Sequence, residues 1–229
     1  VDEKLPIDYQ QILTEINTVG KFNSDIFSIL LNNANPGIKY VLLADTLTPA
    51  IKNKNKNLVE LLLNQKEPND DSLIKAVLID DLDIVNIILD HNNKPSFVNN
   101  KSNEGTALFI AADKNYVNIV ERLLLVKGID PSLYERNDKT PLISSIVNLN
   151  LKIMNLILDF YGDEIKNQVW QLNKAIKMIF EMISSNPNEE QAKNNNTQII
   201  KTATTITQVK KQPINKIDQE QILPIIRRI

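Results

Sequence analysis

The sequence has 229 residues, a formal net charge of −2, and 42% hydrophobic against 24% charged residues, which are ordinary proportions for a globular protein that buries a core. It contains no cysteine and a single histidine, His91. Disulfide frameworks, thiol nucleophiles, cysteine-ligated zinc and multi-histidine metal sites are therefore excluded. The nearly balanced charge argues against a general nucleic-acid binder, which carries a strongly basic face.

The first 44 residues predict an N-terminal capping repeat. Apolar residues at helical spacing predict one helix over Tyr9–Val19 and a second over Ser24–Asn32, with Gly20 breaking the chain between them. An array of repeats needs an atypical unit at each end to cover its apolar face. We therefore expect residues 1–44 to form a degenerate repeat that covers the first end.

The stretch that follows this hairpin has a weaker pattern. Asn35-Pro36-Gly37 predicts a turn. Residues 38–44 stay open between a helix and an extended connector.

Residues 45–162 carry one pattern four times. Each copy has a leucine, then a small residue three positions later, then a polar turn, then a second apolar run. The leucines are Leu47, Leu73, Leu108 and Leu142, and the small residues are Ala50, Ala76, Ala111 and Ser145. A large and a small residue one turn apart on a helix let a neighbouring helix approach closely, and the second run supplies a wide apolar helix face. The pattern predicts four helix-turn-helix repeats, and the gap of 26 between the first two leucines is too short for a full outward hairpin.

The segments TALFIAA from Thr106 and TPLIS from Thr140, with the pairs Ile119-Val120 and Leu123-Leu124, resemble the ankyrin repeat. The resemblance is fullest over residues 98–162 and partial over 45–97. The family's histidine is replaced by Thr48, Ile74, Phe109 and Ile143, and its loop glycine is often absent. The resemblance implies an all-α fold: an ankyrin-like α-solenoid of stacked helix-turn-helix repeats with capping helices at both ends.

The C-terminal part predicts a cap and a tail. Apolar residues form a helical stripe over 164–184, so residues 163–185 are expected to be a C-terminal capping helix or the first helix of a fifth repeat. A coiled-coil seam is a further alternative. Residues 186–229 form a polar tail whose composition indicates disorder, although its apolar spacing also fits a thin helix.

No group of residues predicts catalysis, a cofactor or a metal. The five glycines are too scattered to build a phosphate-binding loop. Asp80, Asp81 and Asp83 lack the glycine and the downstream glutamate of a calcium loop, so they predict a solvated turn. His91 is expected to be a solvated residue at a helix end. We therefore expect a protein that is not an enzyme, with no catalytic, cofactor-binding or metal-binding residue.

The resemblance implies a non-enzymatic module that binds a protein partner through a concave groove of hairpin tips and first helices. Transferred position by position, it places Lys101, Asn103 and Glu104 on one tip, Tyr134, Arg136, Asn137 and Lys139 on the next, and Asp113, Lys114 and Asn148 along the first helices. It also fits the recognition arm of a larger or secreted effector protein. The alternative is a structural module that docks in cis on a catalytic domain or oligomerises through 164–184.

The expected partner is a protein, and not a nucleic acid, a membrane or a small molecule, because the groove residues are polar with mixed charge. No apolar run approaches the roughly 20 residues that span a bilayer. The start of the chain is acidic and lacks the apolar core of a signal peptide. These features predict a cytoplasmic protein, or one in the host cytosol or nucleus if it is a secreted bacterial effector.

Overall fold

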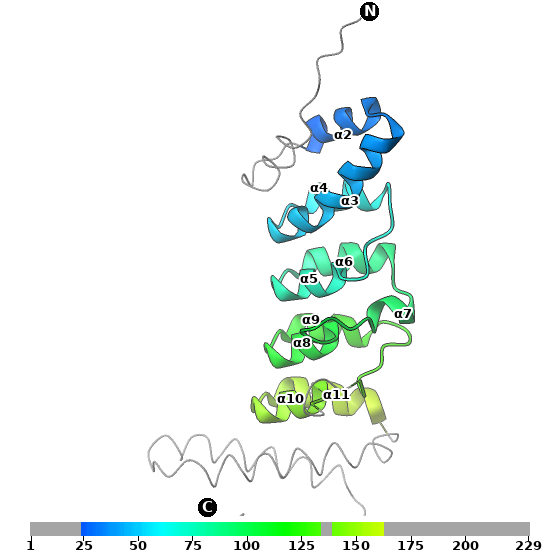
Figure 1. Cartoon of the computed structure of the whole chain (residues 1–229). Coiled ribbons are helices and arrows are strands. Elements are labelled where there is room, and N and C mark those ends of the chain that lie inside the picture. The colour runs from blue at the N-terminus through cyan, green and yellow to red at the C-terminus, as the bar shows by residue number, and fades with distance from the viewer. Residues whose placement is uncertain (1–23, 134–138, 163–229) are drawn as a thin grey trace, which may run out of the picture. The chain divides into compact units, whose positions relative to one another are not determined.

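The structure is a computed structural model that describes residues 24–133 and 139–162 (Figure 1). Its helices are α2 (Ser24–Asn33), α3 (Pro36–Lys52), α4 (Lys56–Leu63), α5 (Ser72–Leu78), α6 (Leu82–His91), α7 (Pro95–Val98), α8 (Ala107–Asp113), α9 (Val117–Leu124), α10 (Pro141–Val147) and α11 (Leu151–Tyr161). The helix expected over Tyr9–Val19, and everything expected of residues 163–229, lie outside the described residues.

The described residues belong to two compact units. The first contains residues 24–110 and 121–129, and the second contains residues 111–120, 130–133 and 139–162. The division passes through α8 and α9, the helices of the third repeat.

Paired helices form each unit. In the first unit, α3 packs against α4 and α5 against α6, and these pairs stack through the contacts of α3 with α5 and of α4 with α6 (Figure 1). In the second unit, α10 packs against α11. The buried residues include every position of the predicted pattern: Leu47, Leu73, Leu108 and Leu142 with Ala50, Ala76, Ala111 and Ser145. The sequence pattern therefore identified the faces that form the core.

The same turn joins the two helices of all four pairs in the described residues. The residue two positions before the start of the second helix has a positive φ: 55° at Lys54, 51° at Asp80, 61° at Asn115 and 55° at Leu149. The next residue donates its main-chain N–H to the carbonyl oxygen of the small anchor residue, from Asn55 to Ala50 (3.0 Å), Asp81 to Ala76 (3.5 Å), Tyr116 to Ala111 (2.9 Å) and Asn150 to Ser145 (2.8 Å). This bonding is that of a Schellman motif, in which glycine usually occupies the positive-φ position. Here each of the four positions holds a side chain instead.

Short polar side chains begin most of these helices. The side chains of Asn55, Asp81 and Asn150 accept the N–H groups of Leu58, Ile84 and Ile153, each at 3.1 Å. The hydroxyls of Thr106 and Thr140 accept the N–H groups of Phe109 and Ile143, each at 3.2 Å. Such N-caps satisfy main-chain donors that the helix leaves unpaired, and they fix where each helix starts.

Helix α3 is longer than the sequence pattern predicts. The Asn35 side chain accepts the N–H of Ile38 at 2.9 Å, and Pro36 occupies the first turn of the helix, where its missing N–H costs nothing. The turn predicted at Asn35-Pro36-Gly37 is therefore wrong, because these residues begin a helix. The helix runs through residues 38–44 to Lys52, so the open choice for 38–44 is resolved as helix.

The connections between pairs differ in length. Residues 64–71 join α4 to α5, whereas residues 92–106 join α6 to α8 and include α7. The longer connection ends in a hairpin with an antiparallel bridge between Lys101 and Thr106. The prediction that the first gap is too short for such a hairpin is confirmed.

A glycine is required where the chain leaves α9. Gly128 has φ 81°, and an added Cβ would lie 2.8 Å from the Cγ of Pro95 in α7. The Asn99 side chain also donates to the Gly128 carbonyl oxygen at 2.8 Å. Gly162, which follows the last residue of α11, also has a positive φ, of 48°.

Candidate functional site

The hairpin tip at residues 101–106 displays three of the predicted partner-binding side chains. Lys101, Asn103 and Glu104 are all exposed. The main chain beneath them is closed by two hydrogen bonds between Ser102 and Gly105, of 3.1 and 3.3 Å. The Ser102 hydroxyl accepts the N–H of Glu104 at 3.1 Å and lies 2.9 Å from the Glu104 carboxylate. The tip is thus a fixed platform that carries exposed side chains of both charges.

The predicted residues at the ends of two first helices contact each other. The Asn148 side chain donates to the main-chain oxygen of Asp113 at 2.7 Å, and the Asp113 carboxylate accepts a hydrogen bond from the hydroxyl of Ser144. Lys114, in the same turn as Asn115, is exposed. Asp113 and Asn148 therefore help to hold α8 to α10, a role that sequence analysis did not predict.

The remaining predicted residues belong to the tip that follows α9. Tyr134, Arg136 and Asn137 lie outside the described residues, so the structure does not locate them. Lys139, immediately before the N-cap Thr140, is half-buried.

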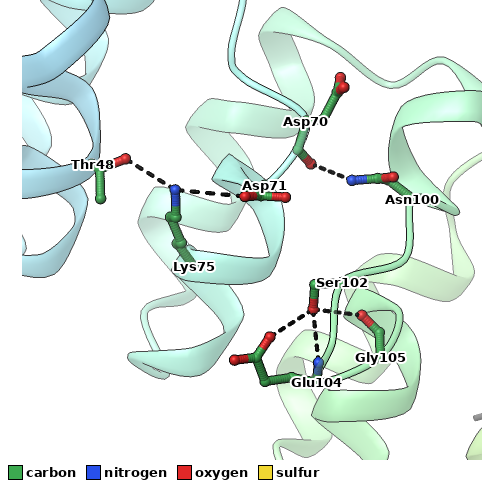
Figure 2. A network of polar contacts seen from close by, with 8 residues as sticks. All are labelled: Thr48, Asp70, Asp71, Lys75, Asn100, Ser102, Glu104 and Gly105. Atoms are coloured by element: carbon green, nitrogen blue, oxygen red, sulfur yellow. Dashed lines mark hydrogen bonds and ion pairs between the residues drawn. The ribbon is translucent and has the colours of Figure 1, made fainter.

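A polar network on the first helices was missed by sequence analysis (Figure 2). The Lys75 ammonium of α5 donates to the Thr48 hydroxyl of α3 at 3.1 Å and lies 3.9 Å from the Asp71 carboxylate. The Asn100 side chain, at the start of the hairpin, donates to the main-chain oxygen of Asp70 at 3.0 Å. This network joins α3, α5, the short connection and the hairpin.

The separation along the sequence between contacting residues could have revealed this network. Thr48 and Lys75 are 27 residues apart, and so are three other contacting pairs: Lys56 with Asp83, Asn64 with His91, and Glu67 with Lys94. This separation is one more than the spacing of 26 between the first two leucine anchors, Leu47 and Leu73. A search for complementary side chains at that separation would have found the pairs.

Two of the three aspartates at residues 80–83 make structural contacts. Asp81 caps α6, and Asp83 accepts a hydrogen bond from the Lys56 ammonium of α4. That hydrogen bond raises the pKa of Lys56 above the ordinary lysine value, with help from the charge of Asp81 and against a smaller opposing effect of desolvation. Within residues 24–133 and 139–162, no group of three His, Cys, Asp or Glu side chains could hold a metal ion.

His91 is more constrained than the sequence indicates. Its Nδ1 lies 2.8 Å from the carbonyl oxygen of Ile87, and its Nε2 lies 3.2 Å from the Oδ1 of Asn64 in α4's C-cap. The residue is the last of α6, as expected of a helix-end histidine, and it is half-buried, which is less solvent exposure than the sequence indicated. The packing of α4 against α6 brings these groups together.

Two comparisons with known proteins bear on this arrangement. Residues 73–169 match the family model described as ankyrin repeats in three copies. Residues 73–169 are ankyrin repeats. A comparison of the sequence with curated proteins found no match. The family match and the helical pairs together confirm the all-α ankyrin fold that the sequence predicted.

Ankyrin repeats are generally protein–protein interaction modules, and the family is typically non-enzymatic. Figure 2 shows the contacts of Lys75 with Thr48 and Asp71, of Asn100 with Asp70, and of Ser102 with Glu104 and Gly105 in the hairpin tip. Among the described helices, none is both long enough and apolar enough to cross a bilayer.

Proposed function

We propose that the chain is a non-enzymatic module that binds a protein partner through the hairpin tips and first helices of its ankyrin repeats. The family supports this proposal at the level of a protein partner in general. The particular surface is our own assignment. Its centre within the described residues is the tip that carries Lys101, Asn103 and Glu104.

The observation that carries the proposal is that different groups of this tip fix its shape and face the solvent. Main-chain bonds and the Ser102 hydroxyl hold its shape, while the side chains of Lys101 and Asn103 are exposed. A fixed main chain reduces the ordering cost of binding, since less conformational freedom is lost when the partner arrives. Exposed charges of both signs favour a partner surface that is itself polar and mixed in charge.

The test compares two triple variants of the full chain. The first replaces Lys101, Asn103 and Glu104 by alanine. The second replaces Lys152, Asn155 and Asp159 on α11 by alanine, which removes the same types of charge from three exposed positions of a second helix. Both should leave helicity and the melting temperature nearly unchanged, because exposed side chains contribute little to stability.

The measurement is the affinity for a protein captured from the source cytosol and then purified. We expect the tip variant to bind at least about tenfold more weakly, as expected when a hot-spot residue is lost, and the α11 variant to bind like the unchanged chain. Equal affinity of both variants and the unchanged chain would contradict the tip assignment. A loss confined to the α11 variant would assign binding to the second helices.

The second tip stays part of the proposal through Tyr134 and Arg136, two residue types that are frequent at binding hot spots. The double change Tyr134→Ala and Arg136→Ala is expected to abolish capture without changing the melting temperature. A double variant that binds at full strength would remove this tip from the surface.

The remaining expectations about role and location stay predictions. They are the recognition arm of a larger or secreted effector, the cytoplasmic location, and the absence of nucleic-acid, membrane and small-molecule partners. The alternative of docking in cis or oligomerising through 164–184 concerns residues that the structure does not describe.

A further inference from the structure

Helix α3 carries an accessible face that contains none of the predicted partner-binding residues. The side chains on this face are spaced four, three and four positions apart, which places them on one side of an α-helix. They are the exposed Val41, Asp45 and Lys52 and the half-buried Thr48. The buried residues of the helix occupy its other sides: Leu42, Thr46, Leu47, Ala50 and Ile51. We call the accessible face the α3 stripe.

The α3 stripe is continuous with the first helix of the next repeat. The Thr48 hydroxyl accepts a hydrogen bond from the Lys75 ammonium of α5 at 3.1 Å (Figure 2). Lys75 in turn lies 3.9 Å from the carboxylate of Asp71, one turn earlier. The stripe therefore belongs to the side of the repeats that the first helices form. The inference below rests on the proposed function, because that function assigns this side to the partner.

One end of the α3 stripe is apolar. Val41 is 42% exposed, and Tyr40, the residue before it, is 67% exposed. The Lys66 ammonium lies 5.3 Å from the centroid of the Tyr40 ring, a cation–π contact that orders the ring. An exposed tyrosine that is already ordered suits a binding anchor, since little side-chain freedom is lost when a partner covers it.

The charge that remains available beside this apolar pair is negative. Asp45, one turn after Val41, is exposed and forms no ion pair with any described residue. Asp71 precedes its leucine anchor by two positions, as Asp45 does, and 57% of its side chain is exposed. The two lysines that contact these segments, Lys66 and Lys75, are already engaged with an aromatic ring and a hydroxyl. A basic side chain of a partner is therefore the complementary charge.

We propose that the α3 stripe binds an extended segment of the protein partner in which an apolar side chain and a lysine or arginine are two positions apart. The apolar side chain covers Tyr40 and Val41, and the basic one pairs with Asp45. Val41 and Asp45 are separated by about 6 Å along the helix. Side chains two positions apart in an extended segment point the same way and are separated by about 7 Å. Lys52 lies about 10 Å beyond Asp45 and disfavours a second basic side chain there.

The first step of the test is a selection that does not require the natural partner. Random peptides displayed on phage are selected on the full chain, and the enriched sequences are synthesised for affinity measurements. We expect an apolar residue and a lysine or arginine two positions apart to recur among them. Enrichment of acidic peptides, or no enrichment, would overturn the proposal.

The second step removes the apolar anchor. Tyr40→Ser with Val41→Ser should weaken the selected peptide at least about tenfold, the loss expected at a hot spot. The matched control is Leu125→Ser with Phe160→Ser, two apolar side chains that are 81% and 43% exposed, and it should leave the affinity unchanged. The melting temperature of each variant reports whether the repeats stay folded. Equal affinities of the two double variants would contradict the proposal.

The third step reverses the charge. Asp45→Lys should weaken the selected peptide about tenfold and should bind a second peptide, in which glutamate replaces the basic residue, more tightly than the unchanged chain does. This gain cannot result from damaged folding, so it decides the matter if the serine variants are unstable. Asp159→Lys, at an exposed carboxylate of α11, is the control and should change neither affinity. Without the gain in Asp45→Lys, the proposal fails.

The last step separates this inference from the proposed function and from another occupant. A peptide that is lost when Lys101, Asn103 and Glu104 become alanine, but is kept by the serine variants of α3, would overturn the inference and leave the proposed function standing. A peptide that neither set of changes weakens would overturn both. Self-association of the unchanged chain in sedimentation equilibrium, abolished by Tyr40→Ser with Val41→Ser, would assign the stripe to a second copy and overturn the inference.

Discussion

The side chain of Asn148 donates a 2.7 Å hydrogen bond to the main-chain oxygen of Asp113, a residue 35 positions earlier in the chain. The Asp113 carboxylate in turn accepts the hydroxyl of Ser144, whose residue is only 1% exposed. Both Asp113 and Asn148 were predicted to face a partner. That role stays a prediction, and their contacts also tie the end of α8 to α10, so stability is a property that their substitution should change.

Asp113→Ala should lower the free energy of unfolding by about 1–2 kcal/mol, because it leaves the Ser144 hydroxyl without its acceptor. Asp113→Asn keeps an acceptor oxygen at the same place and should lower it less. Urea unfolding followed by far-UV circular dichroism measures both variants. A third variant that combines Asp113→Ala with Ser144→Ala should recover part of the loss. Equal stability of Asp113→Ala and the unchanged chain would contradict the structural role.

Lys54→Gly should stabilise the chain by up to about 1 kcal/mol. Lys54 has φ 55°, a conformation that costs roughly 1–2 kcal/mol for a residue with a Cβ and little for glycine. The side chain is exposed, so its removal sacrifices little packing. The matched control is Lys52→Gly, at the last residue of α3, where glycine should destabilise by a similar amount. Melting temperatures that move in the same direction would rule out this account of the turn.

Thr46→Val should also stabilise, by about 1 kcal/mol. The Thr46 hydroxyl is buried and has no hydrogen-bond partner among the described residues, and such a group costs its full desolvation energy. The same substitution at Thr140 should have the opposite sign, because that hydroxyl caps α10 by accepting the N–H of Ile143 at 3.2 Å and loss of a cap costs about 1 kcal/mol. Chemical denaturation of the two variants measures both values. Two destabilised variants would show that Thr46 has an acceptor in solution.

The core of this fold was predictable from the sequence because it depends on local periodicity. The Leu-x-x-Ala anchors, such as Leu73 with Ala76, mark a helix face that needs a close neighbour, and all of them are buried. The start of α3 was not predictable in the same way. Pro-Gly is a strong turn signal, yet Asn35 and Pro36 also suit a helix N-terminus, and only the packing of the long helix decides between these outcomes.

The candidate surface was predictable only in part, and for a related reason. The exposure of Lys101, Asn103 and Glu104 follows from their place on a hairpin tip, a local property. The contacts of Asp113 with Asn148 and of Lys75 with Thr48 join residues 35 and 27 positions apart. They depend on the exact stacking of neighbouring repeats, which the residue types alone do not specify.

The ion pair between Lys56 and Asp83 should be measurable as a shifted titration. Asp83 accepts a hydrogen bond from the Lys56 ammonium, which raises the pKa of Lys56 above its ordinary value. Because the folded state binds this proton more tightly than the unfolded chain does, the pair stabilises the fold at pH values below the ordinary lysine pKa. That contribution is lost as the pH rises through the pKa of Lys56 in the folded state.

Asp83→Asn should therefore lower the pKa of Lys56 toward the ordinary lysine value, as followed by NMR titration of its side chain at alkaline pH. The matched control is Asp90→Asn, which removes a carboxylate of the same helix that pairs with Arg122 at 3.6 Å and should leave the Lys56 titration unchanged. Both partners are substantially exposed, at 44% and 65%, so added salt should reduce the shift in the unchanged chain. A Lys56 titration that is identical in the unchanged chain and in Asp83→Asn would mean that the two side chains are not paired in solution.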